Sequence, residues 1–248
     1  MRRLLGLWAA LSALASCGGG SAEADPPMPP PPNFPAGITG AIRGRVRFEG
    51  PVPPPGRVPM ATNPECAALH DGPVLDEAIA VRDGRLKNVF VHVKQGLEKY
   101  AFPWPTEPVV VSNARCLYVP RVAGAQVHQP VRFVNEDPAA HNIHGFAAQG
   151  RFNFTLSMKG LGQTLKFRRP EVMIPLKCDL HPWMIGYLGV VPHPFHRVTG
   201  EDGAFELSGL PEGEYAVEAW HEKCGTQTRG VRVTPGATAE VEFVFRAP

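Results

Sequence analysis

The stretch Cys178-Asp-Leu-His181-Pro-Trp-Met184 places a thiol, an imidazole and a thioether within seven residues. Residues 171–178, which lead into it, and residues 187–191, which follow it, have the length and the apolar content of strands. We therefore predict a loop whose two ends are held by strands. The thiol, the imidazole and the thioether are then fixed by a rigid scaffold rather than carried on a mobile segment.

A second source of imidazole lies upstream, in His141-Asn-Ile-His144. One thiolate, two imidazoles and a weakly held thioether form the ligand set of a trigonal copper site with a long axial methionine. Zinc is the alternative because it also binds Cys and His, but it favours further Cys or His ligands over Met. His144 is an alternative to His141 as a ligand; we expect it instead at the surface or behind the ligands.

The rest of the chain consists of short alternating segments and many turn-forming residues. Its 248 residues include 26 Gly and 28 Pro, which favour strands joined by turns over packed helices. A helical turn is expected only near residues 64–69, and His92 is expected at the surface because it faces away from the valines of its strand. The predicted fold class is all-β, a sandwich or a pair of sandwiches. Further strands are predicted at residues 42–48, 86–94, 108–112, 117–122, 129–135, 152–156, 163–167, 203–207, 215–220, 230–233 and 240–245.

The spacing Cys178-x-x-His181-x-x-Met184, preceded by the pair His141-Asn142, resembles the type 1 copper site of the cupredoxins. The tight loop is similar to that of the amicyanin branch of this family. The resemblance implies a Greek-key β-sandwich that binds one copper ion through His141, Cys178, His181 and Met184. It also implies that the backbone N–H of Asn142 donates to the Cys178 thiolate. We further expect His181 to be the exposed edge through which electrons reach the metal.

A second resemblance lies in residues 198–220, which are similar to a carboxypeptidase regulatory-like domain, a transthyretin-like sandwich. The first two strands of such a module lie far upstream here, at residues 42–48 and 88–94. We infer one regulatory-like sandwich, built from residues 38–105 and 195–248, with a cupredoxin domain of residues 106–194 inserted into it. A simple tandem of two domains is the alternative. Insertion requires contacts between residues 42–48 and 215–220.

The N-terminus has the pattern of an export signal, with the basic start Met1-Arg-Arg and an apolar run over residues 4–15. The run ends in Leu14-Ala-Ser-Cys17, which resembles a bacterial lipobox. Residues 1–17 are therefore predicted to be a lipoprotein signal peptide with Cys17 as the lipidated residue; an ordinary signal peptide is the alternative. Residues 18–37 are a Pro- and Gly-rich linker. We expect a periplasm-facing lipoprotein of the cell envelope, held to the membrane by its lipid, with Gly18 favouring the outer membrane.

The five cysteines can be assigned if the protein is exported, because disulfides persist outside the cytoplasm. With Cys17 assigned to lipid and Cys178 to metal, we predict a disulfide between Cys66 and Cys116 and an unpaired Cys224. Such a bond closes a loop of about 50 residues, which a chain-entropy model credits with roughly 4 kcal/mol. The alternative is that Cys224 pairs with one of the other two.

The sequence gives no sign of catalysis or of nucleic-acid binding. A net charge of +2 supplies no basic footprint. No Ser-His-Asp order, phosphate-binding glycine loop or working carboxylate pair is recognisable, so no enzyme activity is expected. The expected function is electron carriage through one copper ion, with an unidentified redox protein as partner. The alternatives are a copper-delivery module for an exported oxidase or reductase, and a structural adhesion sandwich with a vestigial site.

Overall fold

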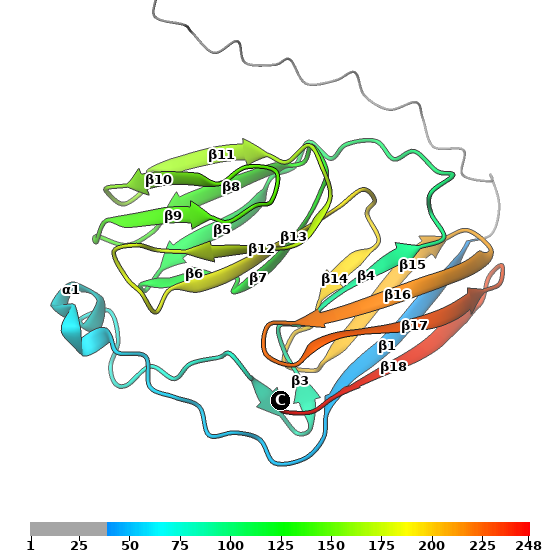
Figure 1. Ribbon diagram of the computed structural model, residues 1–248, viewed down its shortest axis with the longest axis horizontal. Helices are drawn as coiled ribbons and strands as arrows, with labels where there is room; N and C mark the ends of the chain where they lie inside the picture. The colour runs from blue at the N-terminus through cyan, green and yellow to red at the C-terminus, as the bar shows by residue number, and fades with distance from the viewer. Residues whose placement is uncertain (1–38) are drawn as a thin grey trace, which may run out of the picture.

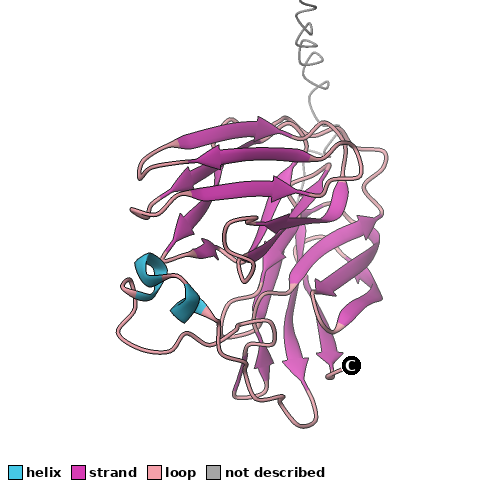
Figure 2. Cartoon of the chain, turned by 60° about the vertical axis from the view of Figure 1, so that its left-hand side comes forward, coloured by secondary structure: helices cyan, strands magenta, loops and turns pink. Residues whose placement is uncertain are grey.

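The computed structural model describes residues 39–248, and this part of the chain is almost entirely β-structure (Figure 1). Two short helices at one edge are the exceptions (Figure 2). The all-β prediction is confirmed. The predicted signal peptide, its Cys17 and the linker of residues 18–37 lie outside the described residues. From residue 39 onward, neither helix is long and apolar enough to cross a membrane.

The middle of the chain forms one pair of sheets, ordered β10-β9-β12-β13-β7 and β11-β8-β5-β6. Strand β8 shows why these segments are strands: Val131 and Phe133 are fully buried while Arg132 between them is exposed, which is the two-residue period of a half-buried strand. The elements are β5 (Val109–Ala114), β6 (Leu117–Val119), β7 (Val122–Gln126), β8 (Pro130–Asn135), β9 (His141–Gly145), β10 (Phe152–Leu156), β11 (Gly162–Lys166), β12 (Glu171–Lys177) and β13 (Ile185–Val191).

The two ends of the described chain form a second pair of sheets (Figure 1). One is ordered β15-β1-β3-β2, with β18 on the other side of β1, and the second is ordered β14-β4-β16-β17. The elements are β1 (Gly40–Phe48), β2 (Val81–Arg82), β3 (Arg85–Leu86), β4 (Phe90–Gln95), β14 (His196–Val198), β15 (Ala204–Leu210), β16 (Gly213–His221), β17 (Gly225–Val233) and β18 (Thr238–Phe245).

Strands from before and after the middle segment share this second sandwich. Strand β1 pairs with β15 in antiparallel and with β18 in parallel orientation, and β4 lies between β14 and β16. Ile42 and Val46 of β1 belong to the same hydrophobic core as Val217 of β16. The chain therefore leaves this sandwich after β4, builds the other one, and returns at β14.

The two sandwiches pack against each other through β4, which is buried on both faces. Phe90 of β4 lies in a cluster with Val122 and Val191 of the other sandwich. Gly124 of β7 and Gly189 of β13 permit this approach, because a Cβ atom at either position would lie within 2.7 Å of the Phe90 ring.

This packing overturns the expectation for His92. Its side chain is buried, only 6% exposed, and its Nε2 lies 3.3 Å from a carboxylate oxygen of Glu218. The alternation of β4 correctly separated His92 from the valines, but the face opposite the valines is covered rather than solvated. A covering layer supplied by another part of the chain leaves no trace in the local pattern.

Residues 117–122 were expected to form one strand and instead contribute to two. Strand β6 pairs with β5 in one sheet, and β7 pairs in parallel with β13 in the other. Pro120 stands between them and has no N–H to donate to a ladder, which fits a crossing point better than the interior of a strand.

The helical residues lie in a segment that we call the cap, residues 57–75. Its two ends pair through a bridge between Arg57 and Leu75, and it contains the 3-10 helix η1 (Met60–Thr62) and the helix α1 (Pro64–Ala67). The expected helical turn near residues 64–69 is thus present. The side chain of Asn63 caps α1 by accepting from the N–H of Cys66 at 3.2 Å.

Candidate metal centre

Three of the four predicted ligands lie in the loop between β12 and β13. The backbone closes this loop on itself, since the Cys178 N–H donates to the Met184 carbonyl at 3.3 Å and the Met184 N–H donates to the His181 carbonyl at 2.9 Å. All three side chains are buried, with Cys178 2% and His181 3% exposed. The loop therefore holds its donor groups inside the protein, and β12 and β13 hold its two ends as predicted.

His141 reaches the loop from β9, the neighbour of β12. The two strands are antiparallel and pair at Lys177 and His144, so β9 continues past the end of β12 and its first residue, His141, lies beside the loop. The Nδ1 atoms of His141 and His181 are 3.1 Å apart, and Sγ of Cys178 is 3.6 Å from Nδ1 of His181. Donor atoms about 3 to 4 Å apart are what ligands at about 2.0–2.3 Å from a single ion require. The donor set therefore fits one metal ion.

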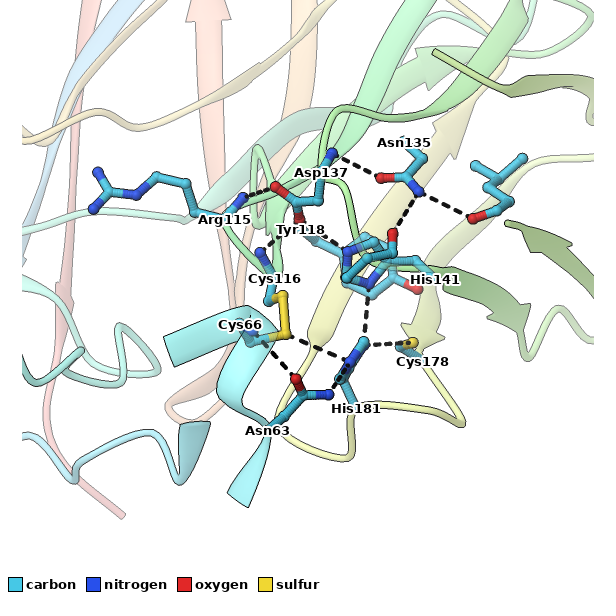
Figure 3. Close-up of polar contacts among 12 residues, drawn as sticks. Asn63, Cys66, Arg115, Cys116, Tyr118, Asn135, Asp137, His141, Cys178 and His181 are labelled. Atoms are coloured by element: carbon cyan, nitrogen blue, oxygen red, sulfur yellow. Dashed lines mark hydrogen bonds and ion pairs between the residues drawn. A yellow bond between two sulfur atoms is a disulfide. The ribbon is translucent and has the colours of Figure 1, made fainter. Parts of the chain in front are cut away.

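Asp137 fixes the orientation of the His141 ring (Figure 3). Its carboxylate oxygen lies 2.9 Å from Nε2 of His141. A carboxylate accepts, so Nε2 carries the proton and Nδ1 presents its lone pair to the site. Asp137 is itself held by the backbone N–H groups of Arg115 and Cys116, at 2.6 and 2.7 Å. A histidine ligand backed by a carboxylate is the usual device for orienting the ring and raising its basicity.

The Cys178 sulfur receives the hydrogen bond that the resemblance implied. The backbone N–H of Asn142 lies 3.4 Å from Sγ. Burial raises the pKa of the Cys178 thiol, but the adjoining His141 side chain and the backbone N–H groups of Asn142, Leu180 and His181 outweigh it, and the net pKa is lowered. The side chain of Asn142 accepts from the Asp179 N–H at 2.7 Å, which joins β9 to the start of the loop. The environment therefore favours a thiolate at Cys178.

Met184 is fully buried in the hydrophobic cluster that also contains Cys178. Trp183 packs on the same cluster and donates its indole N–H to the Cys116 carbonyl at 3.0 Å. The apolar surroundings exclude water from the thioether side of the loop.

The expectation that His181 is an exposed edge is wrong. The cap covers it: Nδ2 of Asn63 lies 2.9 Å from Nε2 of His181, and Sγ of Cys66 lies 3.5 Å from the same atom (Figure 3). Burial lowers the pKa of His181, and the neighbouring charge of His141 lowers it further. The exposed residues of the loop are Asp179, Leu180 and Pro182 instead, and Leu180 is 52% exposed.

The hydrogen bonds around both imidazoles form one directed chain. Asn63 uses its oxygen to cap α1, so its amide nitrogen donates to Nε2 of His181. His181 then carries its proton on Nδ1 and donates to Nδ1 of His141, whose Nε2–H donates to Asp137. A metal bound to Nδ1 of His181 must displace that proton, so the cap and the site are linked through one ring.

The predicted disulfide between Cys66 and Cys116 is confirmed, with 5.6 Å between the Cα atoms. Cys224 is free, as expected, and half-buried in the other sandwich. The bond ties the cap to the hairpin between β5 and β6 and places the two sulfur atoms beside His181.

His144 stays outside the donor cluster. Its side chain is 22% exposed, and its Nδ1 lies 3.0 Å from a carboxylate oxygen of Asp179. The pattern His-Asn-x-His thus sends one imidazole inward and the other outward.

Two residues of the site were missed from the sequence. Asp137 is one, although its place four residues before His141 is a usable signal for a carboxylate partner. Asn63 offered no such signal, because 118 positions separate it from His181. The predicted disulfide was the clue, since it fixes the residues around Cys66 near Cys116.

Comparisons with known proteins yield structural likenesses alone. No protein-family model and no curated protein matches the chain. A reduced variant of amicyanin aligns with 34% of this chain and 81% of its own, at 23% identity and a TM-score of 0.31. A copper-containing nitrite reductase from Thermus scotoductus SA-01 aligns with 42% of this chain and 26% of its own, at 25% identity and a TM-score of 0.31. A purple cupredoxin from Nitrosopumilus maritimus aligns with 33% of this chain and 98% of its own, at 23% identity and a TM-score of 0.29. Each likeness covers less than half of this chain.

Proposed function

We propose that the protein carries single electrons through one type 1 Cu(II)/Cu(I) site with His141, Cys178, His181 and Met184 as ligands. The observation that carries this proposal is the convergence of two Nδ1 atoms and one Sγ atom, buried and within 4.8 Å of one another. Thiolate and imidazole donors with a nearby thioether suit copper. Zinc would be expected with a fourth Cys or His.

The residues around the ligands have roles of their own. Asp137 keeps Nδ1 of His141 free to bind, and the Asn142 N–H stabilises negative charge on the Cys178 sulfur. Copper, when bound, supplies the one-electron couple. Because the ligands are buried and fixed by strands and hydrogen bonds, they move little when the charge of the ion changes, which favours fast transfer.

Coulometry of the copper-loaded protein tests the proposal. One electron per copper ion, taken up and returned without loss of metal, is the expected result. A protein that binds zinc in preference to copper, or that binds copper without a reversible couple, refutes it.

A second function, copper delivery, is favoured by the burial of His181. The cap closes the side of the ring that a redox partner would approach, while the apolar Leu180 remains exposed. An electron carrier retains Cu(I) in the presence of a chelator and docks its partner over Leu180. A delivery protein loses Cu(I) readily. The rate of Cu(I) transfer to a chromophoric chelator separates the two.

The cellular setting remains part of the proposal. We place the protein in the cell envelope as a lipoprotein linked through Cys17, with residues 106–194 as a cupredoxin domain inserted into a regulatory-like sandwich that has no enzyme activity. Labelled fatty acid incorporated by the unaltered chain, and not by Cys17→Ser, is the expected result. Equal labelling of both chains contradicts lipidation at this residue.

A further inference from the structure

The Cys66–Cys116 disulfide lies against the ring of His181, beside the proposed copper site (Figure 3). Nε2 of His181 is 3.5 Å from Sγ of Cys66, while Nδ1 of the same ring is 3.6 Å from Sγ of Cys178. The donor atoms of Cys66, Cys116 and His181 all lie within 4.8 Å of one another and are buried. Of this second group only His181 also belongs to the first site, and Cys66 and Cys116 have no part in electron carriage there.

We propose that reduction of this disulfide creates a second metal site, in which the thiolates of Cys66 and Cys116 and Nε2 of His181 bind one Cu(I) ion. Thiolates are soft ligands that select Cu(I), and imidazole also suits copper. The hydrogen bond from Asn63 requires a lone pair on Nε2, so the ring already presents an acceptor toward the cap. The second site goes beyond the proposed electron carriage and shares only His181 with it.

Formation of the site needs a dithiol reductant from outside the molecule. The dithiol attacks the disulfide through a mixed disulfide, gives up two electrons and two protons, and becomes a disulfide itself. Cys66 and Cys116 gain those electrons and protons as two thiols. Each thiol releases its proton when it binds Cu(I), and the ring of His181 gives up its remaining proton so that, as an imidazolate, it binds the first ion through Nδ1 and the second through Nε2. The oxidation state of copper does not change. Oxidation by a disulfide of the same class removes both thiolates and releases the ion.

Contacts that do not depend on the disulfide hold the cap in place. Arg115 donates from Nε to the Leu69 carbonyl at 3.0 Å and from Nη2 to Nδ1 of His70 at 3.2 Å. His70 returns a hydrogen bond from Nε2 to the Arg115 carbonyl at 2.9 Å. On the other side of the bond, Trp183 donates to the Cys116 carbonyl. The two thiols therefore stay close to His181 once the S–S bond is broken.

The test counts Cu(I) ions on the full chain before and after reduction. The protein is reduced with a dithiol without oxygen, freed of the dithiol, and titrated with Cu(I) against a chromophoric chelator. The oxidised protein is expected to bind one Cu(I) and the reduced protein two. A reduced protein that binds one ion overturns the proposal.

Two variants locate the added ion. The double variant Cys66→Ser with Cys116→Ser is expected to bind one Cu(I) under both conditions. Cys224→Ser is the matched control, because it removes the free thiol of the other sandwich and is expected to keep the second ion. Loss of the second ion in Cys224→Ser alone contradicts the assignment.

Alkylation of the unaltered chain provides a readout that does not depend on these variants folding. Cu(I) is expected to slow the modification of Cys66 and Cys116 by iodoacetamide at least tenfold in the reduced protein, while Cys224 reacts as before. Equal protection of Cys224 indicates binding to an unfolded chain and refutes the site, as does loss of the near-ultraviolet circular dichroism on reduction. The visible spectrum of the oxidised Cu(II) protein reports the first site separately, so the two proposals can fail independently.

Discussion

Replacement of Asp137 by Asn tests whether the carboxylate behind His141 tunes the metal site. The carboxylate accepts from three N–H groups: Nε2 of His141 and the backbones of Arg115 and Cys116. An Asn side chain has one acceptor oxygen, so in either orientation its NH2 group faces at least one of these donors. Each buried donor left unsatisfied costs about 1–3 kcal/mol.

The effect on metal binding follows from the same contact. Loss of a hydrogen-bonded partner behind a metal-bound histidine lowers affinity about 10–100-fold, which is roughly 1.4–2.7 kcal/mol. We expect Asp137→Asn to weaken Cu(I) binding by this factor in a chelator competition and to lower the urea midpoint of the protein without added metal.

Glu136→Gln is the matched control for this prediction. It makes the same change of charge one residue earlier, where the side chain accepts from Ser112 at 2.6 Å and does not contact His141. Its copper affinity is expected to stay within about threefold of the unaltered protein, well inside the 10–100-fold loss expected at Asp137. Equal affinities for the Asp137→Asn and unaltered proteins would falsify the role assigned to the carboxylate.

Two further predictions concern stability and the cap. Burial lowers the pKa of His193 and of His221 to about 4, from 6.5. The unfolded chain therefore binds more protons than the folded protein between about pH 4 and 6.5. The free energy of unfolding is expected to fall as pH drops through this window, by up to about 1.4 kcal/mol per pH unit for each histidine. Urea titrations at several pH values measure this free energy, and a value that does not change with pH contradicts the prediction. Asn63→Ala removes the cap of α1 and the contact with His181, which we expect to cost about 1 kcal/mol and to speed Cu(I) loss to a chelator. Asn63→Asp keeps an acceptor for the Cys66 N–H and supplies one for Nε2 of His181, so it is expected to lose Cu(I) more slowly than Asn63→Ala. Equal rates of Cu(I) loss for the unaltered protein and both variants would show that the cap does not guard the site.

Local features of the sequence were sufficient for the ligand loop. The strands on either side of Cys178 and Met184 follow from their polarity patterns, and β12 and β13 lie where they were expected. Assigning Cys17 to lipid and Cys178 to metal left three cysteines, and of the possible pairs the predicted Cys66–Cys116 bond is the one present. Each of these inferences uses residues close in sequence or a chemical constraint that acts at any distance.

The segments that cover His181 and His92 could not be predicted from local sequence in the same way. The cap hides His181, and the other sandwich packs on the face of β4 that carries Phe90 and the buried His92, through contacts between segments far apart in the chain. A histidine covered by remote residues has the same local pattern as one that faces water. For His181 the predicted disulfide carried part of the missing information, because it required the segment around Cys66 to lie next to Cys116.

The most direct measurement is the visible spectrum of the protein titrated with Cu(II), together with that of Cys178→Ser. An intense thiolate-to-copper band that saturates at one equivalent, and that is absent in Cys178→Ser, is the expected result. Cys178 is the one free thiol among the described residues of that sandwich, so the band has a single source there. A protein that develops no such band, or a band that persists in Cys178→Ser, would contradict the assignment of His141, Cys178, His181 and Met184 as a type 1 copper site.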